Sequence, residues 1–536
     1  RTMFAPSKAV SDPGTDDDSD VADPPWFEWH KFMKYCGPGF LMCIAYLDPG
    51  NLEADLQQGA YAGFTLTWLL LLAHLSGFLI QLLSARLGNA TGMNLAQVCR
   101  RELPYGTSLL VYVMVELAII GADIQEVLGT AVAWQILFNV PLWVGCCLTG
   151  FDAFILLLAD RYGERKLEFL VALLVGTMTI CFWINFAHTL PDISTVGSSL
   201  VPKMPEYAII PGVGTIGAVI MPHNIYLYSA LVLSRRVDRR RDSKIQEANK
   251  YCTFDAGLAL VVCFFINFAV VGCFAQNFFT PTCAHAAVPT ACIDPNLKRA
   301  TWEVYGQCTA NGRAGVCSQI GLRSAGDALQ ASLGNAGRYV WAIGLLAAGL
   351  SSTMTTTYAG QFVMEGFLNL GIPAGARTVI TRIVALMPAI YIARAAVEWG
   401  PLADSVGQWL NVMQSVLLPF ALLPILIFTD SEAIMGRHRN DRLCSYTCWF
   451  AALLVMAANA YLVVSLCRDS FEGYPGQVSS SPLLLVVLLL VGVVYTVSIF
   501  IVGLQNPVRD TETDRLVQPA DMRASAEQAS KGYGAD

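Results

Sequence analysis

The stretch that decides the fold reads Gly37-Pro-Gly-Phe-Leu-Met-Cys-Ile-Ala-Tyr-Leu-Asp48-Pro49-Gly50-Asn51. It opens an apolar window, residues 37–61, which is long enough to cross a bilayer as a helix. An Asp-Pro-Gly triplet in a soluble protein would be an ordinary turn. Inside a membrane span, Pro49 and Gly50 must break the helix, and the freed backbone carbonyls must find partners there.

The composition of the whole chain supports a membrane setting for this stretch. Of its 536 residues, 54% are hydrophobic and 14% are charged, and the mean hydropathy is +0.50. A typical globular protein has about 25% charged residues. Disorder, coiled coil and nucleic-acid binding are therefore excluded as descriptions of the whole chain. We predict an all-α polytopic membrane protein with twelve spans, over residues 37–61, 65–86, 107–135, 141–159, 167–187, 209–233, 251–278, 338–363, 378–399, 403–429, 444–466 and 482–504.

Two polar tails flank the predicted membrane domain of residues 36–504. Residues 1–35 are acidic, with three consecutive aspartates from Asp16, and are predicted to be a disordered tail. Residues 505–536 are predicted to be a second tail. A long polar loop, residues 279–337, separates the seventh and eighth windows.

Lysine and arginine residues in the short loops predict the orientation. If the N-terminus is cytoplasmic, the loops on that side hold 18 of these residues and the short loops on the other side hold 3. Both tails are therefore predicted to be cytoplasmic, and the 279–337 loop to lie outside. The basic run at 235–250 is then the strongest positive-inside anchor, although a patch for anionic lipid or nucleic acid is the alternative.

The outside loop is predicted to contain disulfides, because these bonds persist in an oxidising compartment. Its cysteines are Cys283, Cys292, Cys308 and Cys317. Four cysteines can form two bridges in three different pairings, and the sequence does not choose among them.

A second apolar window is interrupted in the same way as the first. Residues 209–233 contain Gly217-Ala-Val-Ile-Met221-Pro222-His223-Asn224, where Pro222 must break the helix. The two breaks lie 173 residues apart, near the start of two five-helix runs. Interrupted spans at corresponding positions of two halves are typical of an inverted-repeat transporter with its site between them. Two extra helices would follow the repeat.

The residues at the two breaks suit a cation. Asp48 offers a carboxylate oxygen and Asn51 an amide oxygen. The half-helices that end near Ala45 and Ala218 direct their backbone carbonyls into the gap. Met221 adds a thioether, which suits Fe²⁺ or Mn²⁺ better than Na⁺, Mg²⁺ or Ca²⁺, although a methionine in a membrane span can equally be packing.

Polar residues in three other windows are further candidates. Asn411 and Gln414 lie three residues apart on one face of the tenth window and could face the same cavity. Buried carboxylates in membranes mark ion or proton routes, and the third window carries three on one stripe. They are Glu116, Asp123 and Glu126, and Arg382 of the ninth window is their candidate counter-charge.

The two break motifs together resemble those of the Nramp family of divalent metal transporters. The resemblance extends over residues 36–466, including 41–56, 116–128, 217–229 and 347–370. It implies a LeuT-type fold with the repeat in helices 1 to 5 and 6 to 10. It also implies proton-coupled uptake of Mn²⁺ and Fe²⁺ into the cytoplasm, with Co²⁺, Cd²⁺ or Zn²⁺ tolerated.

The same resemblance implies roles for individual residues. The metal ligands would be the side chains of Asp48, Asn51 and Met221, the carbonyls of Ala45 and Ala218, and in some states Asn411. The proton route would involve Asp48, Glu116, Asp123, Glu126, His223 and Arg382. The chain departs from the family pattern at Tyr228, where a second histidine is usual, and at Leu417, where a glutamine is usual. Both departures bear on the coupling of metal transport to proton transport.

Two other functions on the same fold are alternatives: a Mg²⁺ transporter, and a metal sensor that does not transport. No enzyme signature stands out in the sequence. We expect no permanently bound cofactor, with metal and H⁺ as substrates and the bilayer as the other partner. We also expect function as a monomer, in the plasma membrane or in an endolysosomal or vacuolar membrane.

Overall fold

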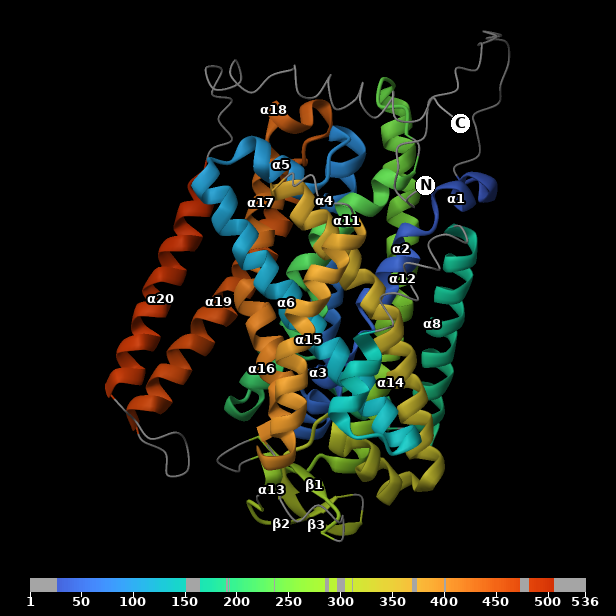
Figure 1. Ribbon diagram of the computed structural model, residues 1–536, viewed down its shortest axis with the longest axis vertical. Helices are drawn as coiled ribbons and strands as arrows, with labels where there is room; N and C mark the ends of the chain where they lie inside the picture. Colours follow the sequence, from blue (N-terminus) through green and yellow to red (C-terminus); the bar gives the residue numbers. More distant parts are fainter. Residues whose placement is uncertain are drawn as a thin grey trace.

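The computed structural model describes residues 27–150, 164–188, 191, 193–235, 237–284, 289–295, 304–310, 312–368, 374–399, 402–472 and 482–505. The chain is a bundle of long helices (Figure 1). Its first half contains α1 (Trp29–Tyr35), α2 (Pro38–Ala45), α3 (Pro49–Ala62), α4 (Thr67–Thr91), α5 (Leu95–Glu102), α6 (Tyr105–Phe138), α8 (Glu164–Ala187) and α9 (Ile193–Ser198). Residues 142–150 are helical as well. The second half contains α10 (Ile209–Val219), α11 (Pro222–Leu231), α12 (Asp242–Phe278), α13 (Pro281–Ala284), α14 (Leu322–Leu368), α15 (Ala374–Trp399), α16 (Leu402–Leu417), α17 (Pro419–Asp430), α18 (Glu432–Met435), α19 (Arg442–Glu472) and α20 (Pro482–Gly503).

The bundle has two distinct ends. Helices α1, α5 and α18 lie at one end, here termed the α1 end, and a small sheet lies at the other, the sheet end (Figure 1). Within the described residues, six helical segments are long and apolar enough to cross a membrane: Thr67–Thr91, Tyr105–Phe138, Glu206–Ser234, Asp242–Phe278, Val406–Asp430 and Arg442–Leu462.

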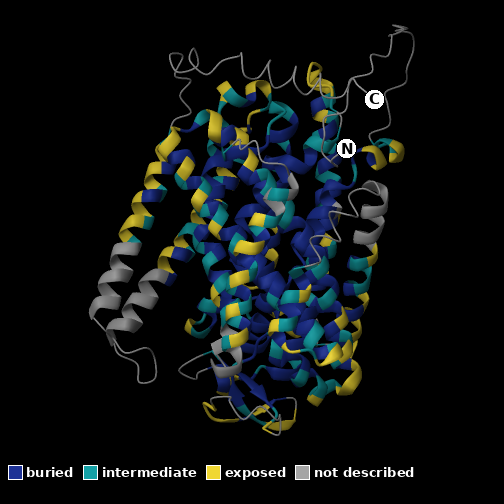
Figure 2. Ribbon diagram, in the orientation of Figure 1, coloured by how far each residue is buried: buried dark blue, intermediate teal, exposed yellow. Residues whose placement is uncertain are grey.

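The outer surface of the bundle is apolar where it would meet lipid. Buried residues fill the centre, and exposed residues line the outer helices (Figure 2). On α15, the apolar side chains of Ile383, Met387 and Tyr391 are 54%, 67% and 66% exposed. Their spacing of four residues places them on one helix face. Such a face is stable against hydrocarbon and not against water.

Both predicted helix breaks are present. Helix α2 ends at Ala45 and α3 begins at Pro49, and the Asp48 side chain caps α3 by accepting from the Asn51 backbone N–H. Helix α10 ends at Val219, and α11 begins at Pro222. Proline fits the first helical position because the N–H that it lacks would have no partner there.

The tenth window is also broken, at a position that was not predicted. Helix α16 ends at Leu417 and α17 begins at Pro419. Since Pro419 has no N–H, the Ser415 carbonyl lacks the usual helical donor four residues on, and its backbone donor is the Leu418 N–H at 3.2 Å. Asn459 of α19 donates to this carbonyl at 2.6 Å, and Tyr495 of α20 donates to the Val416 carbonyl at 2.7 Å.

Some predicted windows are shorter than the helices that contain them. Helix α14 begins at Leu322, although its window was predicted to begin at residue 338. The reason is Gly334, whose φ of 79° and ψ of −173° kink α14 before the apolar stretch begins. The first part of α14 is thus a separate helical segment at the sheet end.

Residues 27–35 differ from the predicted disordered tail. Helix α1 packs on α12, where Tyr35 stacks on Tyr251 with ring centroids 5.6 Å apart. Phe27 and Phe32 join the same aromatic cluster. Burial and the nearby Glu247 raise the pKa of Tyr35 to about 12, so its phenol stays neutral. The remaining tail residues, 1–26 and 506–536, lie outside the described part of the chain.

The loop between α12 and α14 contains both predicted disulfides. They join Cys283 to Cys317 and Cys292 to Cys308. The loop also contains a three-stranded antiparallel sheet that was not predicted, in the order β1-β3-β2. Its strands are β1 (Ala291–Ile293), β2 (Gln307–Ala310) and β3 (Arg313–Ser318).

One face of α3 holds the chain that links this sheet to α14. The Tyr61 hydroxyl donates to the Ile320 carbonyl at 2.8 Å and accepts from the Ile320 N–H at 2.9 Å. The Glu53 carboxylate accepts from the Leu322 N–H at 2.8 Å and from the Gln57 amide at 2.5 Å. Glu53, Gln57 and Tyr61 lie four residues apart on one buried face. These three side chains are termed the α3 clamp.

Candidate metal site

The first break buries a carboxylate beside an amide. Asp48 Oδ1 accepts from the Asn51 backbone N–H at 2.9 Å and from the Asn51 side-chain amide at 2.6 Å. Asp48 is 1% exposed and Asn51 is fully buried. The cap holds the Asp48 carboxylate at the start of α3 and leaves its second oxygen, Oδ2, available.

Two further side chains bring oxygens to the same point. A β-carbon built on Gly50 would lie 2.9 Å from Gln125 Oε1, 3.0 Å from Asp48 Oδ2 and 3.2 Å from Asn411 Oδ1. Asn411 donates to the Gly50 carbonyl at 2.8 Å, and Gln125 donates to Asn411 Oδ1, also at 2.8 Å. A side chain at this position would displace these oxygens.

The second break faces the first. Asn224 of α11 donates to the Ala45 carbonyl at 3.4 Å, and α3 packs against α10. Met221 is the residue immediately before α11, and its side chain makes no capping hydrogen bond. At Gly217 the backbone of α10 lies directly on α16, since a β-carbon there would be 2.1 Å from the Asn411 carbonyl oxygen. Ala218 therefore lies beside the segment that carries Asn411.

Several buried oxygens at the breaks lack a hydrogen-bond partner within the described part of the chain. They are Asp48 Oδ2, Asn51 Oδ1, Gln125 Oε1 and Asn224 Oδ1. An unpartnered buried oxygen is unfavourable, and a buried carboxylate is more so. Hard oxygen donors around a single negative charge, beside a thioether, suit a divalent transition metal.

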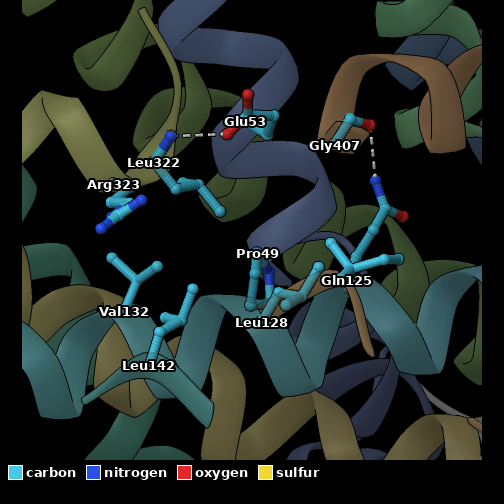
Figure 3. Close-up of a pocket in the computed structure, with 10 residues that line it drawn as sticks. Pro49, Glu53, Gln125, Leu128, Val132, Leu142, Leu322, Arg323 and Gly407 are labelled. Carbon is cyan, nitrogen blue, oxygen red and sulfur yellow. Dashed lines mark hydrogen bonds between the residues drawn. The ribbon is translucent and has the colours of Figure 1, made fainter. Parts of the chain in front are cut away.

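A pocket lies beside the first break, toward the sheet end. It is lined by Pro49, Glu53, Gln125, Leu128, Val132, Leu142, Leu322, Arg323, Ile392 and Gly407. Figure 3 shows Glu53 bonded to the Leu322 N–H on one side, and Gln125 bonded to the Gly407 carbonyl on the other. Pro49, the residue that follows Asp48, is part of this lining, so the pocket adjoins the first break.

The three carboxylates on α6 meet different partners. Arg382 of α15 donates to Asp123 and, at 3.0 Å, to the Thr149 carbonyl, so the structure brings the candidate counter-charge to this stripe. Thr356 of α14 donates to Glu126. Glu116 lies two turns from Asp123 and is only half-buried.

Two predicted site residues, Gln414 and Tyr228, lie away from the gap between the breaks, and a third, His223, lies at its edge. Gln414 donates to the Ala118 carbonyl of α6 at 2.6 Å, so it faces α6 rather than the oxygens at Gly50. The Tyr228 hydroxyl donates to the Cys252 carbonyl of α12 at 3.4 Å. His223 is buried one residue after Pro222, at the start of α11.

Gln125 and Asn224 were not predicted as members of the site. Gln125 is an amide in an apolar helix, directly before Glu126, and this placement was the signal available. Asn224 is part of the second break motif, but its contact with Ala45 depends on how the two breaks meet.

The fold and these two facing breaks define an integral membrane transporter of the LeuT type. The manganese transporter of Eremococcus coleocola has this fold, with a TM-score of 0.72 and 25% identity over 91% of this chain and 96% of that chain. The nucleobase-cation-symport-1 family transporter Mhp1 shares the fold at a TM-score of 0.50 and 13% identity, over 89% of this chain and 95% of that chain. The predicted LeuT-type repeat is confirmed.

The family follows from the sequence comparisons. Residues 39–465 match the model of the natural resistance-associated macrophage protein-like family, Nramp. Metal transporter Nramp4 of Arabidopsis thaliana is 42% identical over 488 residues, which cover 90% of this chain and 87% of the relative. Metal transporter nramp1 homolog of Dictyostelium discoideum is 43% identical over 457 residues, covering 84% and 79%. The chain belongs to the Nramp family of metal transporters, and it is not an enzyme.

Proposed function

We propose that this protein imports divalent transition metals into the cytoplasm together with protons, by alternating access. The observation that carries this proposal is the set of buried, unpartnered oxygens at two facing helix breaks, where Asp48 is the charged group. Because a manganese transporter has the same fold, Mn²⁺ is the first candidate substrate of this protein. Fe²⁺ has similar ligand preferences, and Co²⁺, Cd²⁺ and Zn²⁺ are further candidates.

The proposed metal ligands are the side chains of Asp48, Asn51 and Met221 and the carbonyls of Ala45 and Ala218. Asn411 would join them in a conformation in which it releases the Gly50 carbonyl. Met221 favours transition metals, because a thioether contributes little to a Mg²⁺ or Ca²⁺ site.

The proposed proton route begins at Asp48 and continues through α6. A metal that binds the Asp48 carboxylate displaces any proton held there, and Glu126 and Asp123 are buried carboxylates on α6 that could accept it. Arg382 would keep Asp123 from retaining the proton. Glu116 extends this stripe, and His223 is a separate titratable group beside the second break.

The proposed orientation places the α1 end in the cytoplasm and the disulfide-bonded loop outside. It rests on the excess of lysine and arginine in the loops of the α1 end. The proposal includes twelve spans and function as a monomer, in the plasma membrane or in an endolysosomal or vacuolar membrane.

Uptake into proteoliposomes tests the proposal. The wild-type protein should take up Mn²⁺ and acidify the lumen, and it should discriminate against Mg²⁺. Asp48→Ala should abolish Mn²⁺ uptake, because the remaining ligands are neutral and cannot replace the hydration of a divalent ion. Wild-type uptake by a folded Asp48→Ala protein would contradict the site. Preference for Mg²⁺ would favour a magnesium transporter, and Mn²⁺ binding without uptake would favour a sensor.

A further inference from the structure

A second buried carboxylate lies on the same helix as the proposed metal site. Asp55 of α3 is 1% exposed. Neither of its carboxylate oxygens has a hydrogen-bond partner among the described residues. A lone buried carboxylate is strongly unfavourable, so such a group either stays neutral or is accompanied by a cation.

Asp55 lies on the helix face that begins at the first break. Asp48, Asn51, Asp55 and Gln58 follow one another at spacings of three, four and three residues, which is one stripe of an α-helix. Seven residues separate Asp55 from Asp48, a rise of about 10 Å. Since α3 runs from the break to the clamp, Asp55 lies on the sheet-end side of Asp48.

The neighbours of Asp55 place it at the seam of three helices. One turn beyond it, Gln58 accepts from Thr215 of α10 at 2.9 Å. A β-carbon on the adjacent Gly59 would lie 2.4 Å from the Val271 carbonyl oxygen of α12. Asp55 therefore lies where α3 meets both α10 and α12.

This seam supplies no compensating positive charge. Helix α10 has no charged residue over Ile209–Val219, and α12 has none from Gly257 to Phe278. The charged group that acts electrostatically on Asp55 is Asp48, another carboxylate. Like charges in a low-dielectric interior repel, and a bound cation removes the repulsion.

We propose that Asp55 is a second cation station, where a divalent metal is held between the sheet end and the site at Asp48. Its charged donor is the Asp55 carboxylate, a hard oxygen ligand that lacks the selectivity of a thioether. Because Asp55 is 1% exposed here, the station requires that α3 and α10 separate at the sheet end during alternating access. This inference rests on the proposed transport function and adds a step to it.

Equilibrium binding of Mn²⁺ to the purified full-length protein tests the station directly. In Asp48→Ala, one weaker Mn²⁺ site should remain. Adding Asp55→Asn should weaken that residual binding roughly tenfold or more. The matched control is Glu206→Gln, which removes an exposed carboxylate next to α10 and should leave the residual site intact. Asp55→Glu, which keeps the charge, should retain binding and excludes misfolding as the cause of a loss.

Transport gives the second readout. Asp55→Asn alone should raise the apparent KM for Mn²⁺ uptake, and Glu206→Gln should leave it unchanged. Residual Mn²⁺ binding that does not depend on Asp55, or an unchanged KM in Asp55→Asn, would overturn the proposal and leave Asp55 a neutral buried carboxyl. Absence of uptake by the wild-type protein would instead contradict the transport function, so the two failures are distinguishable.

Discussion

At the scale of single residues, the proposed site assigns the attraction of a cation and the selection among cations to different side chains. Asp48 supplies the charge, and Met221 supplies the one soft donor in the proposed ligand set. Met221→Ala should therefore transport Ca²⁺ or Mg²⁺ better relative to Mn²⁺, since an all-oxygen site suits hard ions. Competition assays in proteoliposomes measure this ratio.

A matched control for this prediction is Met178→Ala on α8. Met178 is fully buried in the apolar core, and its loss should reduce stability while leaving the metal ratio unchanged. If Met221→Ala behaves like Met178→Ala, Met221 is a packing residue.

A second prediction at the scale of residues concerns proton transport through the α6 carboxylates. Asp123→Asn should keep metal binding and should weaken or remove metal-stimulated H⁺ entry, because it removes the carboxylate paired with Arg382. His223→Ala should have a milder effect on H⁺ entry. Parallel measurements of ⁵⁴Mn²⁺ uptake and lumenal pH separate the two fluxes. Full metal-driven acidification by Asp123→Asn would show that protons take another route.

At the scale of helices, the sequence predicts breaks where local chemistry forces them. Asp48-Pro49-Gly50 and Met221-Pro222 interrupt apolar windows, and both breaks are present. The break at Pro419 was not predicted because a proline in an apolar window does not by itself end a helix. Pro388 lies inside α15 and Pro424 inside α17, and neither ends its helix.

Other elements depend on contacts between distant segments, and the sequence does not reveal these. Helix α1 forms because Tyr35 and Phe32 meet Tyr251, more than 200 residues later. The three strands have three to six residues each, too few for a clear periodic pattern. The same limit applies to Gln125, whose role depends on its contact with Asn411 of α16.

The α3 clamp gives the prediction at this scale. Tyr61→Phe removes a hydroxyl that serves both backbone groups of Ile320, which should cost about 1–3 kcal/mol locally. Amide hydrogen exchange should therefore accelerate in the 320–322 segment and at the sheet end of α3. Glu53→Gln should have a similar effect at Leu322, because a neutral amide accepts a weaker hydrogen bond.

Tyr112→Phe is the control for the clamp. Tyr112 of α6 packs its ring against Phe367, so its substitution should leave exchange at 320–322 unchanged. Unchanged exchange in Tyr61→Phe as well would show that α14 starts at Leu322 independently of α3.

At the scale of the whole molecule, the two helices beyond the repeat support a helix within it. Asn459 of α19 supplies the donor that Pro419 cannot, at the Ser415 carbonyl. Asn459→Leu should destabilise the protein by about 1–3 kcal/mol, since it removes the shorter of the two hydrogen bonds to that carbonyl and the acceptor of the Ser415 hydroxyl inside the bundle. A thermal melt of purified protein measures the loss.

A compensating substitution makes this prediction specific. Pro419→Ala restores a backbone N–H four residues after Ser415, so the double variant Asn459→Leu/Pro419→Ala should recover part of the lost stability. If the double variant is no more stable than Asn459→Leu, the contribution of Asn459 lies in packing rather than in this hydrogen bond.

The disulfide between Cys283 and Cys317 also has a consequence for biogenesis. Cys283 lies just after α12 and Cys317 just before α14, so the bond can form only when the adjoining ends of both helices have emerged on the same side of the membrane. Oxidation of this pair therefore indicates that both helices have been inserted correctly. Oxidised and reduced protein migrate differently on a gel. In newly made protein, this shift distinguishes chains in which α12 and α14 are correctly inserted from chains stalled in the translocon.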